Sequence, residues 1–119
     1  MTFRLRIDRL AQREIDEFAA YTSAYSDEFA AEQFARLTDT LTEIAEAPLR
    51  WTYFVLTGAP YRASLFRVGR RTQYWIVYSV DEDERTVSVL RFWNASRDPG
   101  ALDFEGRDNH HQIGEVTFQ

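Results

Sequence analysis

The residues best suited to chemistry in this sequence are arginines, which gather in its second half. The stretch from Val89 to Pro99, VLRFWNASRDP, carries Arg91, Trp93 and Arg97 near the end of a predicted strand. All 14 basic residues of the chain are arginine, and planar guanidinium groups suit recognition of carboxylates and phosphates. The candidate contacts with a target or a phosphate are Arg62, Arg67, Arg71, Arg91, Trp93 and Arg97.

Groups that could transfer protons at neutral pH are scarce near these arginines. No histidine or lysine falls in the predicted strands, and the conceivable proton handlers there are Tyr74, Tyr78 and Glu84. Their ordinary roles are packing and turn solvation. Arginine does not titrate near neutrality, although its charge can stabilise a developing phosphorane. The residue types therefore favour binding over catalysis.

Metal and cofactor chemistry has little support in the sequence. The chain has no cysteine, and its two histidines, His110 and His111, are adjacent and far from any matching ligand pattern. It contains no nucleophile elbow, no phosphate-binding glycine loop and no dinucleotide-binding fingerprint. We expect neither a metal site nor a cofactor.

Length and composition indicate one compact domain. The 119 residues are 45% hydrophobic, no apolar run is long enough to cross a bilayer, and the first residues lack a signal-type apolar block. We therefore expect a cytoplasmic protein that does not bind membranes. The net charge of −5 argues against coating nucleic acid, and we expect no direct, sequence-specific binding to DNA. Because acidic residues crowd positions 8–46 and 81–84, we expect a bipolar surface.

Hydrophobic periodicity predicts the elements that must position the arginines. Apolar and charged residues alternate over residues 3–8, as in a half-buried strand. Helical spacing follows from a cap at Asp8 to about residue 23, and again from a cap at Ser26 or Asp27 to about residue 47. A linker this short predicts an antiparallel helical hairpin.

Three strand-like runs follow, over residues 61–68, 72–80 and 86–93, separated by short turns. They predict an α+β fold of order β-α-α-β-β-β: an antiparallel four-stranded sheet with a helical hairpin on one face. The domain is expected to span residues 1–99. Residues 100–119 are predicted to form a C-terminal tail, either flexible or contributing an added strand.

The predicted sheet has apolar residues on both faces. In the last strand, alternation places Val87, Val89, Arg91 and Trp93 on one face, with Leu90 and Phe92 on the other. We expect the face away from the helices to present aromatic rings and guanidinium groups as a contact surface. The alternative for Arg91 is an ion pair with a carboxylate from the helices.

Several local motifs, in this order and spacing, resemble one family. The sequence resembles the ParE branch of the RelE/ParE toxin superfamily, the stable partners in bacterial type II toxin-antitoxin modules. The likeness covers residues 3–99. Its motifs are AQREIDEF at residues 11–18, Ala47-Pro48, Tyr61-Arg62, YWIVYSV at residues 74–80, VSVLR at residues 87–91 and SRDP at residues 96–99.

This resemblance implies a toxin of the plasmid-stabilisation type with a cognate antitoxin as partner. ParE-like members poison DNA gyrase by binding it, whereas RelE-like members are ribosome-dependent mRNA endoribonucleases. The sequence has Trp93-Asn94 where many RelE-like relatives have histidine, and Trp75 where an arginine is common. Both departures favour a ParE-like toxin that binds a protein target such as gyrase and is not an enzyme.

Two alternatives remain beside this interpretation. One is a RelE-like ribonuclease acting on mRNA at the ribosome, with a tyrosine as proton handler and phosphate contacts from Arg67, Arg71, Arg91 and Arg97. The other is a non-toxic binding module of the same fold. For the first interpretation, we expect Arg91→Ala combined with Arg97→Ala to abolish toxicity while leaving the fold intact.

Overall fold

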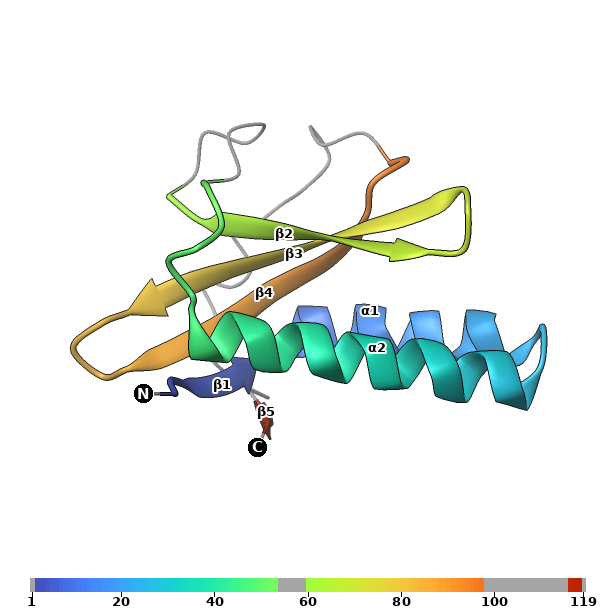
Figure 1. The fold of residues 1–119 in the computed structure, drawn as a ribbon, viewed down its shortest axis with the longest axis horizontal. Coiled ribbons are helices and arrows are strands. Elements are labelled where there is room, and N and C mark those ends of the chain that lie inside the picture. The colour runs from blue at the N-terminus through green and yellow to red at the C-terminus, as the bar shows by residue number, and fades with distance from the viewer. Residues whose placement is uncertain (1, 54–59, 98–115, 119) are drawn as a thin grey trace.

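The computed structural model describes residues 2–53, 60–97 and 116–118, the last of these by its backbone (Figure 1). The α+β class and the β-α-α-β-β-β order are confirmed. The histidine pair, His110 and His111, lies outside the described residues. The elements are β1 (Arg4–Ile7), α1 (Arg9–Ser23), α2 (Asp27–Glu46), β2 (Arg62–Val68), β3 (Thr72–Asp81), β4 (Thr86–Asn94) and β5 (Val116–Phe118).

The sheet differs from the predicted one in the direction of its strands relative to β1. Its strand order is β2-β3-β4-β1-β5. The pairs β2–β3 and β3–β4 are antiparallel as predicted, but β1 pairs parallel with β4. The reason is that α2 returns the chain to the end of the sheet where β1 began, so β2 and β4 run in the direction of β1 (Figure 1). A fifth strand, β5, pairs antiparallel with β1, which is the added strand that the sequence offered as one alternative for residues 100–119.

A β-bulge in β4 overturns the predicted faces of that strand. Val89 pairs with Tyr78 and Arg91 with Val77, so Leu90 is an extra residue without a partner in β3. Alternation therefore resets after Val89. Val87, Val89 and Phe92 face the helices, whereas Arg91 and Trp93 lie on the opposite face.

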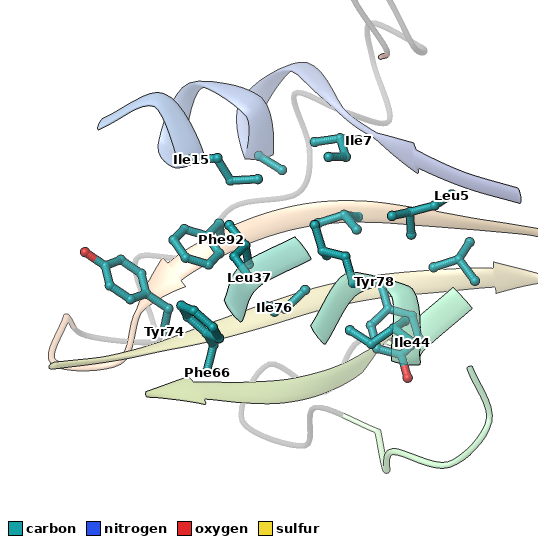
Figure 2. Packing of buried hydrophobic residues seen from close by; sticks show 14 of the residues in the cluster. Leu5, Ile7, Ile15, Leu37, Ile44, Phe66, Tyr74, Ile76, Tyr78 and Phe92 are labelled. Atoms are coloured by element: carbon teal, nitrogen blue, oxygen red, sulfur yellow. The ribbon is translucent and has the colours of Figure 1, made fainter. Parts of the chain in front are cut away.

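The main core lies between the sheet and the two helices (Figure 2). The ring of Phe18 in α1 lies edge-on to Phe66, Tyr74 and Phe92, with centroids 6.1, 5.3 and 5.2 Å away. Tyr74 stacks on Phe92 at 4.4 Å. Rings in these geometries add about 0.5–1.5 kcal/mol per pair beyond the burial of their apolar area. From the helices, the buried members of the core are Ala11, Ile15, Phe18, Leu37, Leu41, Ile44 and Ala45.

The helix ends follow local signals in the sequence. Ser26 caps α2, because its hydroxyl accepts the backbone N–H of Phe29 at 2.9 Å. Asp8 holds the N-cap position of α1, where its backbone carbonyl accepts the N–H of Gln12 at 2.9 Å, but its side chain makes no cap hydrogen bond. After α2, the buried carbonyl of Pro48 accepts the Tyr78 hydroxyl at 2.6 Å and ties the segment to β3.

Candidate functional site

Arg91 is engaged by a carboxylate of α1, which was the alternative that the sequence left open. Its guanidinium donates to Glu14 at 2.7 and 3.2 Å, and the two side chains are only 11% and 13% exposed. Glu14 also accepts the backbone N–H of Phe92 at 2.8 Å. The last residue pair between β1 and β4 is Ile7 with Val89, so the amide of Phe92 lies beyond the end of β1. Glu14 therefore accepts the hydrogen bond that a neighbouring strand would otherwise accept.

Arg62 also makes intramolecular contacts. Its guanidinium donates to the carbonyl of Trp51 at 2.7 Å and lies 4.5 Å from the ring centroid of Tyr53. These contacts hold the segment that follows α2 against the start of β2. We infer that substituting Arg62 would disturb this connection as well as any contact with a target.

Trp93 lies between two guanidinium groups. The carbon centres of Arg91 and Arg97 are 5.0 and 5.7 Å from its ring centroid. Its side chain is only 5% exposed, so in this structure the ring supports the arginines more than it offers a contact surface of its own. Within the described part of the chain, its indole nitrogen is the one buried side-chain nitrogen or oxygen without a hydrogen-bond partner.

The remaining candidate arginines are exposed. Arg67 is the penultimate residue of β2, Arg71 lies in the β2–β3 turn beside the equally exposed Arg70, and Arg97 follows β4. The turn is possible because Gly69 has a φ of 66°, a left-handed conformation that glycine adopts easily. It lies at the opposite end of the sheet from the acidic β3–β4 turn at residues 82–85 (Figure 1). The six candidates therefore divide into contacts within the molecule and exposed groups.

An apolar pocket lies where the turn between α1 and α2 meets the β2–β3 turn. Its volume is about 480 Å³. Tyr21 and Tyr25 are 42% and 68% exposed, and their rings stand edge-to-face at 5.4 Å. Phe29 continues the series, with its ring 5.8 Å from that of Tyr25. The lining residues are Tyr21, Tyr25, Phe29, Val68, Gly69, Arg70, Arg71 and Thr72.

A second, more polar pocket of about 280 Å³ shares Tyr21 and Thr72 with the first. Tyr74 enters it from β3 and Arg97 from the end of β4. Burial raises the pKa of Tyr74, Tyr21 adds to the shift, and the Arg97 guanidinium opposes it. The phenol therefore keeps its proton at neutral pH. The full lining is Glu14, Glu17, Phe18, Tyr21, Thr72, Tyr74, Phe92, Asn94 and Arg97.

The other conceivable proton handlers occupy structural positions. Burial raises the pKa of Tyr78 to about 12, and its hydroxyl donates a hydrogen bond to the carbonyl of Pro48. Glu84 is exposed in the β3–β4 turn, where its backbone N–H donates to the Asp81 carboxylate at 3.0 Å. No group of three or more potential metal ligands occurs among the described residues. The geometry of this region fits recognition better than acid–base chemistry.

Two features of this region were missed by sequence reasoning. The sequence did not single out Glu14, which pairs with Arg91 and accepts the N–H of Phe92 in β4. The cluster of Tyr21, Tyr25 and Phe29 was also missed, because these residues lie around the short linker between the two predicted helices. Its signal was present: the three aromatic residues follow one another at intervals of four.

The fold and these surfaces define a small α+β protein suited to binding another macromolecule. Residues 5–99 match the model of the ParE toxin of the type II toxin-antitoxin system, parDE. The chain belongs to this family, which is the resemblance noted in the sequence, and membership implies a cognate ParD antitoxin as partner. No curated protein and no solved structure matches the chain significantly. Within the described residues, no helix has the length and apolar character needed to span a bilayer.

Proposed function

We propose that this ParE toxin acts in the cytoplasm by binding a protein target, with DNA gyrase as the first target to test, and that its antitoxin silences it by binding. The proposal rests mainly on one observation: exposed arginines and aromatic rings lie together, and burial raises the pKa of the nearby tyrosines Tyr74 and Tyr78. Among the exposed cations, those near the two pockets include Arg67, Arg70, Arg71 and Arg97. Arginine and aromatic side chains contribute most of the energy in many protein interfaces.

The two pockets support recognition of a protein chain. They adjoin at one end of the molecule, and exposed arginines border both of them. An apolar side chain of a partner would fill the pocket of Tyr21, Tyr25 and Phe29, while a neighbouring carboxylate would pair with Arg70 or Arg71. Such a contact suits an antitoxin segment despite the negative net charge of the toxin, because the local charge at the rim is positive.

The ribonuclease alternative requires a group that accepts a proton from the attacking 2′-hydroxyl. Tyr74 and Tyr78 have raised pKa values, which makes each a poor base at neutral pH. Arg97 could contact a phosphate, but it cannot exchange protons near neutrality. This is the reason for preferring protein binding.

Induction of the gene alone separates the candidate functions. Supercoiled DNA and mRNA are examined in the same induced cells, with and without the antitoxin gene. Trapped gyrase cleavage with intact transcripts supports the proposal. Transcripts cut on ribosomes would establish the ribonuclease instead, and unimpaired growth would leave a non-toxic binding module. Arg97→Ala is the informative variant, because this exposed side chain lies outside the buried ion pair.

A further inference from the structure

Among the residues that the structure describes, most of one sheet edge has no neighbouring strand. In the order β2-β3-β4-β1-β5, the outer strands are β2 and β5. Only the start of β2 is covered in the described structure: Tyr53 bridges Arg62, and the N–H of Ala63 donates to Thr52 at 3.1 Å. The rest of this edge continues to Val68.

The direction of the free backbone groups follows from that contact. Because the N–H of Ala63 points away from β3, the N–H and carbonyl groups of Leu65 and Arg67 point outward as well. Within the described residues, no backbone hydrogen bond beyond the ladder involves Leu65 or Arg67. An edge with such groups is a template for strand addition.

The charge along this edge selects the kind of segment that would fit. No aspartate or glutamate occurs from Pro60 to Val80. The side chain of Arg67 is exposed on the strand itself. Arg36 of α2 is also exposed and lies 5.1 Å above the ring of Phe66, which faces the helix layer next to the edge. An added strand would therefore meet cations on both faces of the sheet.

We propose that the outer edge of β2, at Leu65 and Arg67, receives an extended acidic segment of the antitoxin as an added strand. This inference rests on the proposed function and specifies how the partner binds. The end of β2 leads directly into the apolar pocket, because Val68 and Gly69 line it. A segment that pairs with β2 can thus place an apolar side chain in this pocket where it leaves the sheet.

Substitutions at Arg67 separate backbone pairing from charge. Proline at this position removes an N–H that makes no bond to β3, and edge strands tolerate proline there. The probe is the purified cognate ParD antitoxin. We expect Arg67→Pro to weaken its binding by about tenfold to hundredfold, and the matched control Arg67→Ala by about fivefold or less. Thermal unfolding of each free variant checks that the fold is kept.

Hydrogen exchange of the unsubstituted protein gives an independent measurement. The amides of Leu65 and Arg67 should exchange rapidly in the free toxin and become protected in the complex. Equal exchange in both states, or equal binding by Arg67→Pro and Arg67→Ala, would overturn the edge inference while leaving the toxin assignment intact. Protection in the free toxin that disappears on dilution would assign the edge to a second copy instead. Absence of both toxicity and antitoxin binding would overturn the proposed function itself.

Discussion

Removal of the Glu14 carboxylate should destabilise the fold more than any other single change on the exposed side of α1. Glu14 makes the ion pair with Arg91 and accepts the N–H of Phe92. Glu14→Ala leaves a mostly buried guanidinium and a strand amide without this acceptor. Glu14→Gln keeps an acceptor for the amide but removes the charge. Glu17→Ala is the matched control, because this carboxylate lies three residues further along α1 and is exposed.

The magnitude follows from the burial of the pair. Breaking a fully buried pair by removing one partner costs about 3–5 kcal/mol. The side chains of Glu14 and Arg91 are still 13% and 11% exposed. We therefore expect Glu14→Ala to lower the free energy of unfolding by about 2–4 kcal/mol. Glu14→Gln should cost about 1–2 kcal/mol, which is the charge-assisted part of the interaction. Glu17→Ala should stay within about 0.5 kcal/mol.

Urea unfolding followed by circular dichroism measures these differences as shifts of the midpoint at constant slope. Adding Arg91→Ala to Glu14→Ala should cost less than the sum of the single changes, since the second removes a charge that the first left unpaired. Strict additivity, or a Glu14→Ala variant as stable as Glu17→Ala, would refute this account of β4. Because of this ion pair, we now expect Arg91→Ala to destabilise the fold, contrary to the expectation from the sequence.

Two further perturbations test the structure away from this pair. The pKa of Tyr78 is about 12 in the folded protein, against an ordinary value of 10.0. Its contribution to the free energy of unfolding is therefore fully present below pH 10 and falls by about 2–3 kcal/mol as the pH rises to 12. Alkaline unfolding curves should show this loss in the unsubstituted chain and lack it in Tyr78→Phe, and identical curves would exclude the assignment. Ser26→Ala should lower the unfolding free energy by about 1 kcal/mol through loss of the α2 cap, whereas no change in its urea midpoint would show that the cap contributes nothing.

The order of elements was predictable because each carries a local signal. The apolar stripes of α1 and α2 and the alternation in β2 and β3 depend only on residues close in sequence. The Ser26 cap is of the same kind. The parallel pairing of β1 with β4 was not predictable in this way, because it depends on where the helical hairpin returns the chain.

The candidate site was less predictable, since its features depend on contacts between distant residues. The bulge at Leu90 shifts Arg91 and Trp93 to the other face, and an alternation rule carries no signal for an inserted residue. The partner of Arg91 lies 77 residues earlier in the chain. Sequence pattern could identify arginines as the important residue type, but only the fold separates those held inside from those exposed.

The most direct test of the central claim uses the purified toxin, purified gyrase and relaxed plasmid. We expect the toxin to inhibit supercoiling or to trap cleaved DNA, Arg97→Ala to weaken this effect, and the antitoxin to abolish it. Full supercoiling activity at every toxin concentration, together with transcripts cut when the toxin is added to translating ribosomes, would contradict the account and favour catalysis.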